Sequence, residues 1–368
     1  MNAPLPSHAY RTGFKAQAYQ SFISGLKTYW GGELYREVVV AAEQTASKDA
    51  EELESRMRTN AAYRLYGWLE RRVQQFKWSG RYGFHAMVQE QKQALEPLLA
   101  AVPVEVPGRL RLDPALKMPD YLTETETHQQ PGGLWKDLVN AYAIAWYAQG
   151  PSFSGTNPNE LVDWYARLIL ERCKEHGLAP KLIADLGCSA GRSTRAIKRA
   201  FPQASLVGCE LCEPMVRHGH LRSIDENTDI TLYQRNAEDL GCFGDSSVDV
   251  VTSHWLFHEM PPRAIRNSIR ESKRVLKPGG LFAMYDMVQV PGGVIGEWLH
   301  TGYAARNNEP FAHTLIKMKL KQELEAAGFT DVRIDLTSPQ HASVDVPEHL
   351  PPRRLHYMSF VSAFAPGA

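Results

Sequence analysis

Residues 182–202 read LIADLGCSAGRSTRAIKRAFP, and this stretch decides the fold of the chain. An apolar run ends in an acid, Asp185, and a turn that contains Gly187 and Gly191 follows it. Glycine permits backbone dihedrals that other residues avoid, and it lets a ligand approach the main chain closely. A helix is predicted next, and its first N–H groups, at 192–194, favour a carboxylate because they lack partners within the helix. The stretch therefore predicts a strand, a ligand-binding turn and a helix in succession.

The turn differs from the dinucleotide-binding fingerprint, because no third glycine follows Gly191 at the spacing of G-x-G-x-x-G. A tight turn without a ligand remains an alternative for this segment alone. A second apolar run, in LVGCELCEPMV at 206–216, favours the ligand, because it ends in Glu210, nineteen residues beyond Gly191. An acid at the end of that strand can accept hydrogen bonds from both ribose hydroxyls of a nucleoside.

Beyond Lys181 the sequence alternates between short apolar runs and helical segments. The apolar runs lie at 182–187, 204–210, 230–234, 248–254, 281–287, 332–336 and 357–365. Helical segments separate the first five, which is typical of βαβ units and a parallel sheet. The last two runs follow a single helix, so we expect them to form a hairpin at the edge of the sheet.

The ordered set of motifs resembles that of the class I S-adenosylmethionine (SAM)-dependent methyltransferases, in particular the small-molecule group. The resemblance covers roughly residues 180–336 and a final strand near 357–365, and it includes SHWLFHEMPP at 253–262 and the Lys-Pro-Gly-Gly turn at 277–280. It implies an α/β fold with a Rossmann-like, doubly wound, seven-stranded sheet. It also implies transfer of a methyl group from SAM to an acceptor, with release of S-adenosylhomocysteine (SAH).

The resemblance implies a set of cofactor contacts. In that family the acid–x–Gly–x–x–x–Gly turn holds the methionine part of SAM and the acid after the second strand holds the ribose, which implies Asp185 and Glu210 here. The family's Asp-Ala pair is Asn236-Ala237, whose amide oxygen can still accept from the adenine amino group, and Ser189 replaces the middle glycine of the turn. The implied contacts are Asp185, Gly187, Cys188, Ser189, Gly191, Glu210, Leu211, Asn236, Ala237, Glu238 and Ser253.

The segment after the fourth strand supplies the catalytic candidates His254, His258 and Glu259. Correct orientation of the reactants can contribute ~7–11 kcal/mol to methyl transfer, and a general base adds a factor of about 10²–10⁴. A hydroxyl acceptor usually needs a base, whereas an amine or a thiol does not. Either histidine could be a base or could orient the substrate, and the alternative is that one of them packs structurally against the sheet. No metal is predicted, because the spacing does not match a site with three or four convergent ligands.

The remainder of the chain predicts a second unit. At 368 residues two domains are expected: a mainly helical N-terminal domain at 1–150, as a substrate cap or dimerisation unit, and the methyltransferase domain at 151–368. Leu65, Leu69, Val73 and Phe76 fall at helical spacing and predict a buried face. Residues 288–314, which contain several glycines, predict a lid-like insertion, and a fixed packing insertion is the alternative.

The charge balance and the cysteine content of the chain restrict the classes of substrate and partner that we expect. Lys plus Arg equals Asp plus Glu, 41 each, which disfavours a nucleic-acid substrate because phosphate binding needs clustered positive charge. Five cysteines are too few and too scattered for a disulfide framework, and no signal peptide or membrane span is visible, so we expect a cytoplasmic protein with free thiols and no membrane partner. A small-molecule acceptor and a homodimer are expected, with the accepting atom (O, N or S) open. Methylation of a protein or peptide, and a non-catalytic SAM-binding module, are the alternatives.

Overall fold

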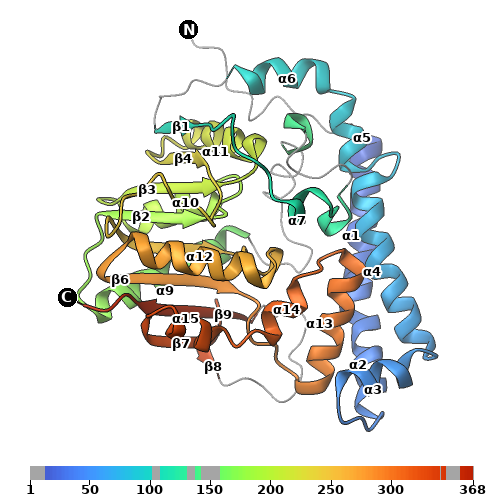
Figure 1. Ribbon diagram of the computed structural model, residues 1–368. Helices are drawn as coiled ribbons and strands as arrows, with labels where there is room; N and C mark the ends of the chain where they lie inside the picture. Colours follow the sequence, from blue (N-terminus) through green and yellow to red (C-terminus); the bar gives the residue numbers. More distant parts are fainter. Residues whose placement is uncertain are drawn as a thin grey trace.

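A computed structural model describes residues 13–101, 108–130, 137–141, 158–339, 341–344 and 357–367. These residues form one β-sheet with helices on both faces and a cluster of helices beside it (Figure 1).

The sheet has the strand order β1-β4-β3-β2-β5-β6-β9-β7-β8 within the described residues. The strands are β1 (Arg109–Arg111), β2 (Leu182–Leu186), β3 (Ser205–Glu210), β4 (Thr231–Gln234), β5 (Val248–His254), β6 (Leu276–Asp286), β7 (Thr330–Ser338), β8 (His341–Val344) and β9 (Met358–Phe364). The strands from β1 to β6 pair in parallel, whereas β9, β7 and β8 pair antiparallel to their neighbours. The doubly wound α/β fold is thus confirmed.

Two details of the predicted sheet are wrong. The described sheet has nine strands instead of seven, because β1 adds to the free edge of β4 and β8 to that of β7. An edge strand presents unpaired N–H and C=O groups, which a further short strand can pair. The last two predicted strands do pair with each other, but β9 lies inside the sheet between β6 and β7.

Helices cover both faces of the sheet. One face packs against α9 (Pro158–Glu175), α10 (Arg192–Ala200) and α11 (Glu213–Asp225), and the other against α12 (Pro262–Val275) and α15 (Leu320–Ala326). Each face has its own apolar core, which includes Tyr165 on the first side and Ile265 on the second. Since both faces are covered, the parallel strands are apolar on both sides, and their carboxyl ends lie together at one edge of the sheet.

The N-terminal region is mainly helical, as predicted. It comprises α1 (Phe14–Tyr29), the π-helix η2 (Trp30–Leu34), α2 (Tyr35–Glu43), α3 (Ala50–Met57), α4 (Ala61–Ser79), α5 (Phe84–Gln89) and α6 (Lys92–Ala100). The predicted face of α4 is only partly correct: Leu69 and Val73 are buried, but Leu65 and Phe76 are each 42% exposed. Neighbouring helices pack instead against an adjacent stripe that includes Tyr66. In the described part of the chain, no helix combines the length and apolar character needed to cross a bilayer.

Helix α13 (Gly293–Asn307), from the predicted insertion, packs against this N-terminal cluster (Figure 1). Trp298 and Leu299 are buried in the same apolar cluster as Tyr66, and the Trp298 indole donates a hydrogen bond to Glu54 at 2.7 Å. Arg306, near the end of α13, pairs with the buried Glu70 of α4. The helical cluster is therefore built from two distant parts of the sequence, and α14 (Ala312–Lys317) returns the chain to the sheet.

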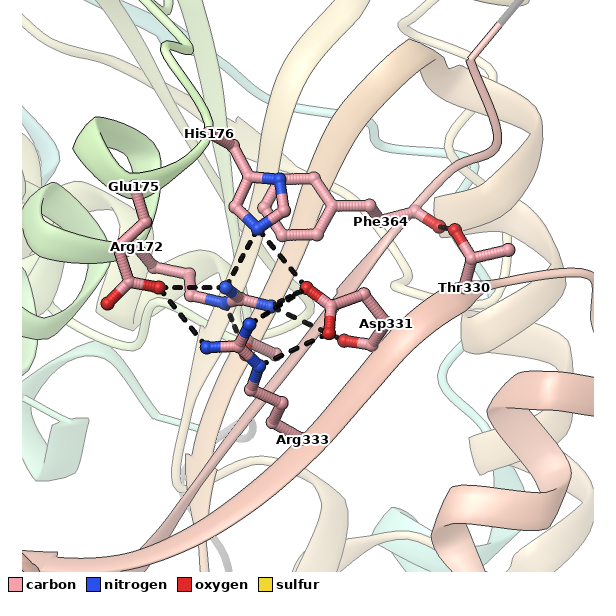
Figure 2. Close-up of polar contacts among 8 residues, drawn as sticks. Arg172, Glu175, His176, Thr330, Asp331, Arg333 and Phe364 are labelled. Atoms are coloured by element: carbon pink, nitrogen blue, oxygen red, sulfur yellow. Dashed lines mark hydrogen bonds and ion pairs between the residues drawn. The ribbon is translucent and has the colours of Figure 1, made fainter.

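A buried arginine joins α9 to the antiparallel strands, as Figure 2 shows. Arg172 donates to Ser362 Oγ at 3.0 Å and to Glu175 at 2.9 Å, and it pairs with Asp331. Its guanidinium lies 4.8 Å from the ring centroid of Phe364. Phe364 pairs with Leu281, near the amino end of the apolar part of β6, so this cluster lies far from the carboxyl ends of the parallel strands.

Candidate functional site

The turn after β2 leaves no room for larger side chains. Gly187 and Gly191 have φ angles of 62° and 68°, in the left-handed region that glycine adopts without strain. A Cβ atom on Gly187 would lie 2.5 Å from Leu256, and one on Gly208 of β3 would lie 2.7 Å from the Cys188 sulfur. Ser189 also has a positive φ, of 49°. At Gly187 and Gly208 the main chain therefore packs closely against neighbouring side chains.

Asp185 ends β2 with a carboxylate that is completely buried. Its Oδ2 accepts hydrogen bonds from Ser193 Oγ at 2.7 Å and Thr194 Oγ1 at 2.6 Å, both in the first turn of α10. No residue in the described part of the chain donates to Oδ1. Burial raises the pKa of Asp185 to about 6, the two hydroxyls oppose this change, and the nearby charge of Glu210 adds to it. A buried carboxylate with one open oxygen favours a cationic ligand group.

Glu210 ends β3 and is hydrogen-bonded to the same turn. Its Oε2 accepts from the Ser189 N–H at 3.0 Å and its Oε1 from the Cys212 N–H at 2.9 Å. Burial raises the pKa of Glu210, and these main-chain bonds oppose the rise. Each carboxylate oxygen can accept more than one hydrogen bond. The fixed carboxylate can therefore still accept from two ligand hydroxyls.

In the segment after β4, the polar side chains form hydrogen bonds mainly with other residues of the protein. Asn236 Oδ1 accepts from the Glu238 N–H at 2.9 Å, and the neighbouring Ala237 is buried. The Glu238 carboxylate accepts from Tyr121 Oη at 3.1 Å and from Asn267 Nδ2 at 2.7 Å. Leu211, which follows Glu210, lines a cavity of about 480 Å³ with Met118 and Gln234, among other residues. Both carboxylate oxygens of Glu238 accept from protein donors, whereas the amide oxygen of Asn236 accepts one hydrogen bond and can accept another. The geometry therefore favours Asn236 over Glu238 as a direct ligand contact.

Ser253 and His254 lie at the carboxyl end of β5. Ser253 is buried, and within the described residues neither its Oγ nor His254 Nε2 has a hydrogen-bond partner. The His254 ring stacks on Tyr285 and Trp255, with centroids 5.7 and 5.1 Å apart. Burial lowers the pKa of His254 to about 4, and the charge of Arg192 contributes in the same direction. His254 is therefore neutral at pH 7, with an open ring nitrogen.

His258, in the short helix η4 (Phe257–Glu259), is held by carboxylates on both sides. Its Nδ1 lies 2.7 Å from Asp286 Oδ1 and its Nε2 lies 3.4 Å from Glu259 Oε1. Burial lowers the pKa of His258, but the charges of Asp286 and Glu259 outweigh it and keep the pKa well above its ordinary value. A protonated imidazole with both nitrogens engaged is unsuited to accept a proton. The geometry favours the structural alternative for His258.

Two residues close to these segments carry no signal in the sequence. His128, in the 3₁₀ helix η3 (Thr127–Gln129), lies between two carboxylates, with Nε2 2.9 Å from Glu259 and Nδ1 2.7 Å from Glu309. Tyr121, in α7 (Asp120–Thr123), contacts Glu238. Both come from a segment without regular periodicity, at a sequence separation of more than one hundred residues, so no spacing rule could have identified them.

The site contains histidine, cysteine and carboxylate side chains, which are common metal ligands. Among the residues that the structure describes, no group of three or more His, Cys, Asp or Glu side chains is arranged to hold a metal ion. All five cysteines are free thiols, and Cys209 and Cys212 are buried. Burial raises the pKa of the Cys212 thiol, with the charge of Glu210 adding to the effect. These cysteines therefore behave as small apolar residues.

Known proteins share this part of the chain. A family model described as "Methyltransferase domain" matches residues 183–280. An uncharacterized methyltransferase of Synechocystis sp. is 31% identical over 151 residues, which are 41% of this chain and 68% of that protein. Malonyl-[acyl-carrier protein] O-methyltransferase of Methylococcus capsulatus is 30% identical over 45% of this chain and 58% of its own length. The ubiquinone/menaquinone biosynthesis C-methyltransferase of Nitrobacter hamburgensis is 35% identical over 27% of this chain and 39% of its own.

The fold and the turn define a Rossmann-like domain, and the sequence relatives are methyltransferases. The chain belongs to the class I SAM-dependent methyltransferases, so it is an enzyme of that class and its cofactor is SAM. It spans less than two thirds of the length of the second and third relatives. The family match ends before α13 and contains none of the N-terminal helices.

Proposed function

We propose that this enzyme transfers the methyl group of SAM to a small-molecule acceptor. The observation that carries the proposal is that the carboxyl edge of the sheet is covered: Tyr121 and His128 reach it from the N-terminal region, and Phe311 and Glu309 reach it from the segment after α13. A covered site admits a small acceptor more readily than a folded macromolecule. The relative named for ubiquinone or menaquinone biosynthesis is consistent with this class of acceptor.

The residues of the site fit SAM. Asp185 Oδ1, buried and open, suits the amino group of the methionine part, and the two oxygens of Glu210 suit the ribose hydroxyls. Gly187 and Gly191 allow the left-handed backbone of the turn that joins these carboxylates. When bound, SAM supplies an electrophilic methyl group on a sulfonium, and the protein supplies position and electrostatics. The predicted contacts at the ends of β2, β3, β4 and β5 are proposed on this basis.

His254 is the proposed orienting group for the acceptor. Its neutral ring presents an unpartnered Nε2 at the end of β5, while aromatic neighbours fix its plane. With a pKa of about 4, the imidazole is a weak base, which suits a hydrogen-bond acceptor better than a proton acceptor. We propose Glu259 and His258 as positioning residues. The His254→Ala variant should bind SAH normally and lose methyl transfer, and full turnover would remove His254 from the mechanism.

A screen with labelled SAM tests the function. The protein is incubated with methyl-labelled SAM and a metabolite extract, SAH release is measured, and ultrafiltration separates small from large products. Label in the small-molecule fraction is expected, whereas label that moves with macromolecules would contradict the proposal and favour a protein substrate. The homodimer, the cytoplasmic location and the exclusion of nucleic acid stay predictions.

A further inference from the structure

We propose that residues 113–130, called the strap below, cover the cofactor site, and that Tyr121 and His128 hold the strap in place so that SAH leaves only when these contacts break. The inference rests on the proposed positions of SAM at Asp185 and Glu210, and it adds residues of the N-terminal region to that site. In Figure 1, α7 lies between the sheet and the N-terminal helices.

The first half of the strap contacts the elements proposed to hold SAM. Met118 and Leu122 pack in one apolar cluster with Ala190, Cys212 and Met215. Ala190 belongs to the turn after β2, and Cys212 is the residue whose N–H bonds to the carboxylate at the end of β3. The Asp113 N–H also donates to Gln234, the last residue of β4, at 3.1 Å. The strap is therefore packed against the turn and two neighbouring strand ends.

Tyr121 holds the middle of the strap. Its hydroxyl donates to Glu238 Oε1 at 3.1 Å, and its ring meets Phe311 edge-on with centroids 6.1 Å apart. Burial raises the pKa of Tyr121, and the charges of Glu238 and Glu210 add to the rise, so the phenol lies within electrostatic reach of the proposed ribose site. Because the hydroxyl donates to Glu238, its oxygen can still accept a hydrogen bond. Tyr121 is therefore the strap residue that we expect to contact the nucleoside.

His128 holds the end of the strap. Its two ring nitrogens lie 2.9 Å from Glu259 and 2.7 Å from Glu309, a carboxylate that is only 1% exposed. Burial alone lowers the pKa of His128, but the charges of Glu309 and Glu259 outweigh it and raise the pKa to about 10. The imidazole is therefore a cation at neutral pH. It connects the strap to η4 on one side and to the segment after α13 on the other.

Two side-chain amides continue this attachment by donating to main-chain carbonyls. Gln129 donates to the Arg306 carbonyl at 3.2 Å, and Asn308 donates to the Glu126 carbonyl at 3.0 Å. His128 and Gln129 both have positive φ angles, of 57° and 58°. Two consecutive non-glycine residues keep such a conformation only when surrounding contacts hold it. Loss of the His128 ion pairs should therefore release the strap locally and leave the sheet intact.

The test measures SAH dissociation from the full-length protein by surface plasmon resonance. His128→Gln removes the cation, and we expect SAH to dissociate at least ten times faster. Tyr121→Phe removes one hydrogen bond, and a several-fold faster dissociation is expected. The matched control is His176→Gln, because His176 also pairs with a carboxylate, Asp331 at 3.1 Å, but at the far end of the sheet (Figure 2). Its dissociation rate should stay within twofold of the wild type.

A second measurement covers the case in which a variant does not fold. Hydrogen exchange of the wild-type strap amides is followed with and without SAH, and SAH should slow exchange in residues 113–130. Wild-type dissociation rates in both folded strap variants, or strap amides that SAH does not protect, would overturn the inference. Wild-type protein that fails to bind SAH would overturn the proposed function itself, and the strap with it.

Discussion

Replacement of Asp185 by asparagine should stabilise the free protein and weaken SAH binding at the same time. The amide oxygen can accept from Ser193 and Thr194 as Oδ2 does, and the NH₂ group takes the place of Oδ1, to which no residue within the described ranges donates. Burial raises the pKa of Asp185 from 3.8 to about 6. Since one pKa unit corresponds to about 1.36 kcal/mol, ionisation of this carboxyl costs the folded state roughly 3 kcal/mol at pH 7.

The pH dependence of this effect has a definite sign. A carboxyl whose pKa is higher in the folded than in the unfolded protein binds more protons when folded, between the two values. The stability of the wild type therefore falls as the pH rises from about 4 to about 6. The advantage of Asp185→Asn should be small at about pH 4 and reach its full size above about pH 6, where the wild-type carboxyl is ionised.

SAH binding should change in the opposite direction. A buried hydrogen bond to a charged group contributes about 1.5–3 kcal/mol, so its loss should raise the Kd for SAH about 10- to 150-fold. Scanning calorimetry at two pH values gives the stability, and titration calorimetry with SAH gives the affinity. Asp163→Asn is the control, because Asp163 forms an exposed ion pair with Arg199. An Asp185→Asn protein that melts below the wild type at pH 7, or that binds SAH equally well, would refute the reasoning.

Three further substitutions test the site and the fold. Glu210→Gln should raise the Kd for SAH about 10- to 150-fold, because one charge-assisted acceptor is lost. Its control, Glu213→Gln, should leave the Kd within about twofold, since Glu213 pairs on the surface with a helix neighbour. Titration calorimetry measures the Kd of both variants. Gly208→Ala places a Cβ 2.7 Å from the Cys188 sulfur, so it should displace the turn and weaken SAH binding in the same assay. Arg172→Met removes the donor to the buried Ser362 hydroxyl, whereas the partly exposed Asp331 keeps Arg333 as a partner. The substitution should therefore cost about 1–3 kcal/mol in chemical denaturation, with SAH affinity unchanged in the folded fraction.

The parts of the site that could be predicted from sequence are those set by local chemistry. Gly187 and Gly191 were recognisable because glycine adopts the left-handed backbone of a tight turn after a strand without strain. Asp185 and Glu210 were recognisable because parallel strands bring their carboxyl ends to one edge of a sheet, and the structure connects them through the turn. Such features depend on residues close together in the chain, so their spacing is visible in the sequence.

The residues that sequence analysis missed depend on tertiary packing. Tyr121 and His128 reach the site from a segment without a periodic pattern, and their partners lie 117 and 131 residues away. The buried face of α4 was misplaced for a related reason. Leu65 and Phe76 have helical spacing, but α13, which packs against the adjacent stripe, comes from a part of the sequence more than two hundred residues away.

Glu259 lies in the middle of a chain of buried and half-buried carboxylates and imidazoles. Asp286, His258, Glu259, His128 and Glu309 follow one another as alternating carboxylates and imidazoles. Burial alone would raise the pKa of Glu259, but the charges of His128 and His258 outweigh it and hold the pKa well below its ordinary value. A carboxylate held ionised by two cations is a poor proton acceptor, so the geometry argues against acid–base chemistry at this position. As the last residue of η4, Glu259 contacts His128 of the strap, and this contact positions the N-terminal region relative to the end of β5.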